Sequence, residues 1–212
     1  MLKLVSVLAA GWVGMGGWAV VTIQQLPEYF VAGRPYTIEF KVRQHGHNLL
    51  SDLEPTLIVS SGSNEQRIAA KAKSPGTYAA TFTAPAGGPL TLTIKSGFGA
   101  SNLQLYPAPV VAAGARAPTI SVVDRGRALF IAKGCNACHT NSDLVDRPDN
   151  QQIKVGPELG ARGLARDYVM QKMKNPKSEI MPDLGLNDAE INGIASFLTA
   201  GGTAATGGGG GR

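Results

Sequence analysis

The sequence predicts a multidomain chain with an N-terminal transmembrane helix, then a small all-β sandwich, then a small all-α domain. Three observations predict this. Residues 2–23 are almost entirely apolar, segments between residues 27 and 106 alternate apolar with polar residues, and segments beyond residue 119 show helical spacing. We divide the chain into an anchor (1–24), a β-sandwich (25–107), a linker (108–118), a helical domain (119–200) and a glycine-rich tail (201–212).

The apolar N-terminal run contains a single charged residue, Lys3. As an α-helix, residues 2–23 would extend about 33 Å at about 1.5 Å per residue, enough to cross a hydrocarbon core of about 30 Å. A cleaved signal peptide is the alternative, but its apolar core is usually only about 7–15 residues long, and residues 20–24 make a poor cleavage site. We therefore expect an uncleaved single-pass membrane anchor. Lys3 favours a cytoplasmic N-terminus, with the rest of the chain on the periplasmic or extracytoplasmic side.

The middle of the chain shows the period of two that is typical of strands with one buried face. In the clearest segment, every second residue from Tyr36 to Val42 is apolar and the residues between them are polar. Turn residues such as Ser74-Pro75-Gly76 separate the segments. The spacing predicts an antiparallel β-sandwich of about six or seven strands. The expected strands lie at residues 36–42, 77–83 and 90–94, with weaker ones at 57–59, 67–70 and 103–105.

This segment resembles the YtkA-like and FixH-like immunoglobulin-type domains of bacterial exported proteins. The resemblance rests on residues 33–42, on His45-Gly46-His47, and on Pro75-Gly76-Thr77-Tyr78 leading into a strand. His45 and His47 suggest either a copper site or a polar hairpin loop. We favour the hairpin, because no methionine or cysteine lies in the sandwich to complete a soft metal site.

The linker and the tail differ in composition from the domains around them. Pro107, Pro109 and Pro118 predict a semi-rigid linker that holds a spacing between the sandwich and the helical domain. Residues 201–212 are mostly glycine, alanine and threonine, which predicts a flexible tail.

Three helices are expected in the last domain, over residues 124–133, 164–174 and 187–198. Asp124 lies near the start of the first helix, and Pro176 follows the end of the second. Asn187 and Glu190 are spaced as a capping box, in which each side chain bonds the backbone N–H of the other residue.

The first of these helices leads directly into Cys135-Asn136-Ala137-Cys138-His139. This pattern reads C-x-x-C-H, the attachment signature of c-type haem. Each cysteine sulfur can form a thioether to the haem, and the following histidine can then bind the iron from the same face. The motif predicts one covalently bound haem c, held by Cys135 and Cys138, with His139 as an axial ligand of the iron.

Three alternatives compete with the haem interpretation. A thioredoxin-like redox pair also uses C-x-x-C but expects a βαβ setting, and the sequence shows none. A structural zinc site needs four ligands. The chain has no other cysteine, and its other histidines, His45 and His47, belong to the predicted sandwich. A chance match is the third alternative for any short motif.

The helical domain resembles the class I cytochrome c family. The resemblance rests on residues 126–130, the haem motif, Gly156-Pro157, Asn175-Pro176, Met181-Pro182 and the last helix with Phe197. It implies that Gly126, Phe130 and Phe197 lie where the first and last helices cross. It also implies that the carbonyl of Pro157 is the hydrogen-bond partner of His139, a bond that orients the imidazole and tunes the metal.

The second axial ligand has three candidates in this domain, Met170, Met173 and Met181. Met170 and Met173 have the helical spacing that is typical of core residues. Met181 lies in a proline-bounded loop before the last helix, where the resemblance places the axial methionine. We expect His139/Met181 ligation, which raises the reduction potential. Two strong ligands leave no open position for a substrate, so this ligation favours electron transfer over catalysis.

The sequence therefore predicts a membrane-anchored monohaem c-type cytochrome that transfers single electrons and is not itself an enzyme. We expect it to be a subunit of a respiratory or photosynthetic membrane complex, with a protein donor and a protein acceptor. An independent tethered electron shuttle is the first alternative, and a haem sensor or structural docking subunit is the second.

Charge bears on the partners. The chain carries a formal net charge of +5 at pH 7, yet acidic and basic residues balance between residues 119 and 200. Lys172, Lys174 and Lys177 precede the Met181 loop, where they would either steer an acidic redox partner or form an ordinary solvated helix face. We expect no nucleic-acid partner, since no recognised motif or basic-aromatic pattern is present.

Overall fold

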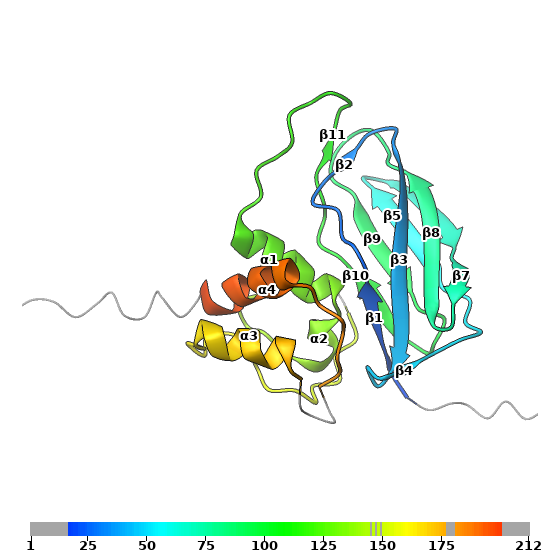
Figure 1. The fold of residues 1–212 in the computed structure, drawn as a ribbon. Coiled ribbons are helices and arrows are strands. Elements are labelled where there is room, and N and C mark those ends of the chain that lie inside the picture. The colour runs from blue at the N-terminus through cyan, green and yellow to red at the C-terminus, as the bar shows by residue number, and fades with distance from the viewer. Residues whose placement is uncertain (1–16, 145, 147, 149, 177–180, 201–212) are drawn as a thin grey trace, which may run out of the picture.

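The computed structural model describes residues 17–144, 146, 148, 150–176 and 181–200. It shows a β-sandwich in the N-terminal half and a small helical region in the C-terminal half (Figure 1). The expected sandwich and the expected helical region are therefore both present. The helices lie against one side of the sandwich, next to β1 and β10 (Figure 1).

The sandwich is built from two main sheets of antiparallel strands. The first has the order β1 (Ala19–Ile23), β3 (Pro35–Gln44), β8 (Thr77–Thr83) and β7 (Lys71–Ser74), and β4 (Asn48–Leu49) pairs with β3. The second has the order β10 (Asn102–Gln104), β9 (Thr91–Lys95), β5 (Thr56–Ser61) and β6 (Asn64–Ala69). A short parallel pair joins β2 (Phe30–Val31) to β11 (Val110–Val111).

Alternation along the strands builds the core between the two sheets. Ile38, Phe40 and Val42 of β3 are fully buried, as the period of two predicts. Phe40 lies opposite Tyr78 of β8, and their rings stack with centroids 6.0 Å apart. The Tyr78 hydroxyl donates to the Leu50 carbonyl over 2.8 Å, so this buried polar group has a partner.

The predicted transmembrane anchor over residues 1–24 is wrong. Residues 19–23, which we expected to end a membrane helix, form β1, and its register with β3 runs from Ala19 opposite Gln44 to Ile23 opposite Phe40. No helix in the described part of the chain is long and apolar enough to cross a membrane. The predicted single-pass topology with a cytoplasmic N-terminus therefore has no support. Residues 1–16 of the predicted anchor lie outside the described residues.

For residues 19–23 the reason for this error is that β1 is buried on both faces. Val21 and Ile23 belong to the core of the sandwich. Val20, on the opposite face, is 2 % exposed and lies against Gly134 of the helical region. A strand covered on both faces lacks the polar alternation of a half-buried strand, and β1 has Thr22 as its single polar residue, so periodicity alone cannot distinguish it from part of an apolar helix.

The predicted linker over residues 108–118 packs partly on the sandwich. Val110 and Val111 pair with Phe30 and Val31, and the backbones of Leu90 and Ala108 exchange two hydrogen bonds of 2.9 and 2.8 Å. This part of the segment therefore continues the sheet structure before the chain enters the helices.

The helical region contains α1 (Val122–Ala132), α2 (Cys135–Cys138), α3 (Arg166–Lys174) and α4 (Asp188–Ala200). α1 crosses α4 at Gly126, where an added Cβ would collide with the carbonyl of Gly193. Phe130 and Phe197 meet edge to face, with ring centroids 5.7 Å apart. The expected crossing role of Gly126, Phe130 and Phe197 is confirmed, and Gly193 is the partner that the sequence analysis did not identify.

The start of α4 shows the expected capping box. The Glu190 backbone N–H donates to Asn187 Oδ1 over 2.9 Å, and the Asn187 N–H donates to Glu190 Oε2 over 3.2 Å. The start of α1 is capped by Ser121, whose hydroxyl accepts from the Asp124 N–H over 3.0 Å. α1 thus begins two residues earlier than we expected.

Candidate functional site

The haem motif begins at a turn that packs against β1 of the sandwich. α1 ends at Ala132, and Gly134 then turns the chain with φ +75°, a conformation that favours glycine. Its N–H donates to the Ile131 carbonyl over 2.8 Å. A Cβ on Gly134 would also overlap the Val20 side chain of β1. Glycine is therefore required here twice, for the turn and for the close approach to the strand.

Both cysteines of the motif lie on α2, one turn apart, and neither forms a disulfide. Burial raises the pKa of the Cys135 thiol to about 12, with a further contribution from Cys138. Burial also raises the pKa of Cys138. A catalytic redox pair needs at least one thiol whose pKa is lowered. The described part of the chain contains no βαβ unit, so the fold gives the thioredoxin-like alternative no support.

The His139 ring is oriented by the loop that follows the motif. Its Nδ1 lies 2.9 Å from the carbonyl oxygen of Pro157. A carbonyl can only accept, so Nδ1 must carry the proton and donate it. In the neutral ring Nε2 then has a free lone pair, which is the atom that a metal would bind. A Cβ on Gly156 would lie 2.5 Å from both Nδ1 and Cε1 of His139. Only glycine at position 156 therefore lets the loop pack this closely against the ring.

Backbone hydrogen bonds hold this loop on the motif. The Gly156 N–H donates to the Cys138 carbonyl over 2.9 Å, and the Ile153 N–H donates to the Ala137 carbonyl over 2.8 Å. Glu158 accepts from the N–H groups of Ser142 and Gly160 over 2.7 and 2.8 Å. Desolvation opposes ionisation of Glu158, but hydrogen bonds from the Thr140 side chain, from the N–H groups of Gly160 and Ser142, and from the Ser142 side chain outweigh it and lower its pKa.

The three candidate methionines differ in their surroundings. Met170 and Met173 lie on α3 and pack against the hydrophobic core, as residues with a structural role would. Met181 is half-buried and lies in the loop that leads to α4. Its role as the second axial ligand stays a prediction.

The lysines near this loop are partly engaged. Lys174 pairs with Asp188 over 2.7 Å, and Lys172 Nζ lies 5.5 Å from the centre of the exposed Tyr168 ring. Lys177, the third lysine of the predicted docking group, lies outside the described residues. The pairing of Lys174 reduces the positive field that this group would present to an acidic partner.

His45 and His47 occupy the turn between β3 and β4, and both are exposed. Within the part of the chain that the structure describes, no group of three histidine, cysteine or acidic residues is arranged to hold a metal ion. The zinc and copper alternatives gain no support from this arrangement.

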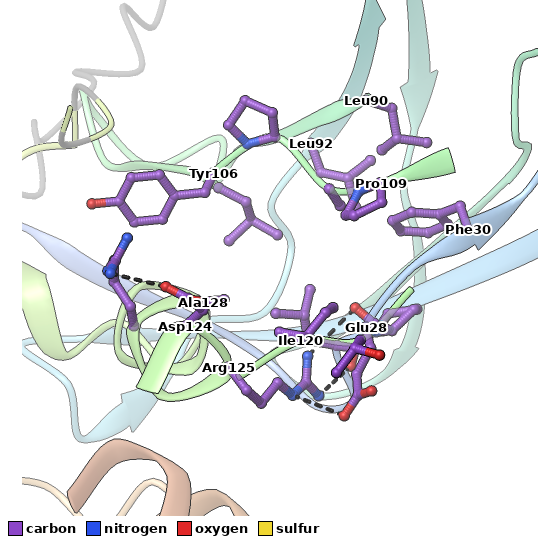
Figure 2. A pocket seen from close by; sticks show the side chains of 17 residues that line it. Glu28, Phe30, Leu90, Leu92, Tyr106, Pro109, Ile120, Asp124, Arg125 and Ala128 are labelled. Atoms are coloured by element: carbon purple, nitrogen blue, oxygen red, sulfur yellow. Dashed lines mark hydrogen bonds and ion pairs between the residues drawn. The ribbon is translucent and has the colours of Figure 1, made fainter. Parts of the chain in front are cut away.

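A cavity of about 390 Å³ lies where α1 meets the sandwich, between β2 and the segment from Leu105 to Pro109 (Figure 2). Arg125 crosses its floor and donates to the Leu26 carbonyl over 2.6 Å, with Glu28 3.8 Å away. No residue of the haem motif lines the cavity, so it is separate from the candidate haem site.

Residues 121–198 match the protein family described as cytochrome c oxidase, cbb3-type, subunit III. The matched segment contains the whole helical region up to Leu198, with Cys135, Cys138, His139, Gly156 and Pro157. The match supports a cytochrome c domain. This family implies a c-type haem and an electron-transfer protein. No curated protein matches the chain.

Several solved structures resemble the chain over the length of a single domain. The Lin-41 filamin domain is 17% identical, with 42% of this chain and 90% of that chain covered and a TM-score of 0.35. Domains 4 and 5 of the S-layer protein SbsC are 21% identical, covering 43% and 44%, with a TM-score of 0.31. The extracellular region of plexin A4 is 10% identical, covering 43% and 11%, with a TM-score of 0.30. At these TM-scores the sandwich is not assigned to a family, and its resemblance to YtkA-like and FixH-like domains stays a prediction.

The residues of the cytochrome c domain fit a haem. Two thiols lie one turn apart on α2, and His139, whose Nδ1 contacts the Pro157 carbonyl, follows them. Gly156 leaves the space that the imidazole ring of His139 needs. A haem bound here would be held by Cys135, Cys138 and His139. The sequence had identified these residues and Pro157, whereas the steric roles of Gly134 and Gly156 became visible only in the structure.

Proposed function

We propose that this protein is a monohaem c-type cytochrome that transfers single electrons. In this proposal Cys135 and Cys138 hold the haem covalently, and His139 and Met181 are the axial ligands. The observation that carries the proposal is the hydrogen bond of 2.9 Å from His139 Nδ1 to the Pro157 carbonyl, next to a C-x-x-C-H motif. This bond leaves Nε2 ready to bind iron.

The bound haem would supply a one-electron redox centre. The chain's own residues have three tasks. Pro157 holds the proton on Nδ1 of His139, which fixes the ring and strengthens its donor nitrogen. Gly156 packs on the ring and limits its rotation. Met181 would close the sixth position with a thioether, which favours ferrous iron and excludes a substrate.

The experiment that tests this assignment begins with the purified full chain after denaturing electrophoresis. Covalent attachment predicts a haem stain that survives denaturation and is lost when Cys135 and Cys138 are both replaced by alanine. Methionine ligation predicts that the methionine-to-iron absorption band disappears in Met181→Ala. Met173→Ala is the matched control, because Met173 packs against the core and should leave the band unchanged.

Two outcomes would contradict the assignment. A chain that retains no haem stain would exclude a c-type cytochrome. A Met181→Ala variant that keeps the band would transfer the ligand role to another residue. Carbon monoxide binding readily to the reduced wild-type protein would instead favour the haem sensor, since a sensor needs an open or easily displaced sixth ligand.

We further propose that the protein works as the haem-bearing subunit of a respiratory or photosynthetic redox complex, with one protein donor and one protein acceptor. The family that matches the cytochrome domain is named for a subunit of an oxidase, which supports this proposal. A haem-stained native gel of cells solubilised in mild detergent tests it. Stain in a large assembly supports the subunit, whereas stain only at the size of the single chain favours the independent electron shuttle.

A further inference from the structure

The sandwich contacts the cytochrome domain on both of the segments that would bind the iron. Gly134, which precedes the two cysteines, lies against Val20 of β1. Pro182, which follows Met181, lies against Gly46 in the turn between β3 and β4. A Cβ on Gly46 would be only 2.8 Å from Cγ of Pro182, so the proline ring fills the space above this glycine. Gly46 is buried, although its neighbours His45 and His47 are exposed.

The two contact points belong to one rigid element. β1 and β3 are adjacent in the same sheet, and Val20 is paired with Arg43, three residues before Gly46. The Gly46 N–H donates to the Arg43 carbonyl over 3.2 Å, and the His47 N–H donates to the Gln44 carbonyl over 3.0 Å. The His45 N–H donates to the Trp18 carbonyl over 3.0 Å, which ties the turn to the start of β1. These hydrogen bonds tie the turn to β3 and to the start of β1, the strand that supports the cysteine segment.

Charge reinforces the contact with the Met181 loop. Arg43 of β3 is 9 % exposed. Burial lowers the pKa of its guanidinium, and the negative charge of Asp183 opposes this effect. Asp183 follows Pro182, so the loop that packs Pro182 against Gly46 also carries a negative charge that attracts Arg43.

We infer that the sandwich is a positioning element for the axial methionine, in which the turn His45-Gly46-His47 holds the Met181 loop at a fixed distance from the cysteine segment. This inference rests on the proposed role of Met181. The turn touches Pro182 and acts on the iron only through its neighbour Met181. The β1–β3 ladder thereby sets the separation between the two halves of the haem site.

A substitution in the sandwich that displaces Pro182 should therefore loosen the thioether on the iron. Because a thioether favours ferrous iron, loosening it lowers the reduction potential and makes the sixth position accessible to carbon monoxide. A sandwich that served only as a separate domain would transmit no such effect.

The test compares two glycine substitutions within the sandwich of the full, haem-loaded chain. Gly46→Ala adds a methyl group against Pro182. Gly33→Ala is the matched control, because Gly33 has nearly the same backbone angle (φ +77° against +83°) but nothing within 4 Å of an added Cβ. Both variants place an alanine at a similar positive φ, so the difference that the structure shows between them is the contact with Pro182. If Gly46→Ala does not fold, Gly46→Asn and Gly33→Asn replace the pair, since asparagine tolerates positive φ and still adds the Cβ.

The readouts are the methionine-to-iron band, the midpoint potential and the binding of carbon monoxide to the reduced protein. We expect Gly46→Ala to weaken the band, lower the potential and bind carbon monoxide more readily, while Gly33→Ala matches the wild type. Equal spectra and potentials in the two variants would overturn the inference while leaving Met181 as the ligand. A band that survives in Met181→Ala would instead overturn the proposed ligation, and the inference with it.

Discussion

Replacing Lys133 by methionine should destabilise the protein strongly, because Lys133 joins α1, α4 and the sandwich at one buried point. Its side chain is 3 % exposed, and Nζ lies 2.6 Å from Glu190 Oε1. The same ammonium donates to the carbonyls of Ile23 and Gln24, each over 2.8 Å. Lys133→Met would leave the Glu190 carboxylate buried without its counter-ion and two carbonyls without a donor.

The magnitude follows from the loss of one partner of a buried ion pair, which costs about 3–5 kcal/mol. Lys174→Met is the matched control, since Lys174 and Asp188 form an equally short pair whose side chains are 44% and 86% exposed. Because solvent screens this exposed pair, Lys174→Met should change the free energy of unfolding much less than Lys133→Met does. Removing both buried charges, in Lys133→Met with Glu190→Gln, should restore much of the stability because neither charge is then left unpaired.

Urea unfolding of the full chain measures these differences in the free energy of unfolding. A Lys133→Met variant that loses less than about 1 kcal/mol, as an exposed pair would, refutes the reasoning. It would mean that water reaches the Lys133–Glu190 pair and that the interface between α1 and β1 is looser than the hydrogen bonds indicate.

Three further predictions concern single residues. Gly126→Ala forces a methyl group into the carbonyl of Gly193. The free energy of unfolding in urea should fall by about 1–3 kcal/mol, as for other overpacked contacts. An unchanged unfolding midpoint would contradict this crossing geometry. Gly156→Ala should displace the His139 ring from the Pro157 carbonyl and shift the reduction potential, and an unchanged potential would count against that contact. Glu158→Gln should lower the free energy of unfolding near pH 7. Because the folded pKa of Glu158 is lowered, its stabilisation is present above the ordinary glutamate pKa and is lost as the pH falls through the folded value, so the difference from wild type should disappear in acid.

Strands with one buried face could be predicted from the sequence, whereas strands with other environments could not. β3 and β8 alternate buried with more exposed residues, and we predicted both. β7 is exposed along its whole length, so it carries no apolar signal and was missed. β1 is buried on both faces and was mistaken for a membrane helix. In each case the environment of the strand, which depends on distant segments, decides whether a pattern exists.

The candidate site divides in the same way. Covalent attachment of a haem requires a fixed local spacing, so Cys135, Cys138 and His139 are visible in the sequence. The hydrogen bond from His139 to Pro157 was predicted only through the family resemblance, and the structure contains it at 2.9 Å. The close approach of Gly134 to Val20 depends on how two distant segments pack, which no local pattern encodes.

Side chains of the cytochrome domain cover exposed edges of the sandwich sheets. The outer edges of β1 and β10 would otherwise present unpaired backbone groups, which invite pairing with other chains. Asn150 covers β10 as a neighbouring strand would: its Oδ1 accepts from the Gln104 N–H over 2.6 Å and its Nδ2 donates to the Gln104 carbonyl over 2.9 Å. Lys133 covers the end of β1 through the Ile23 carbonyl. Because backbone groups of the sandwich are satisfied by side chains of the cytochrome domain, separating the two parts would leave the groups on both sides without these hydrogen bonds.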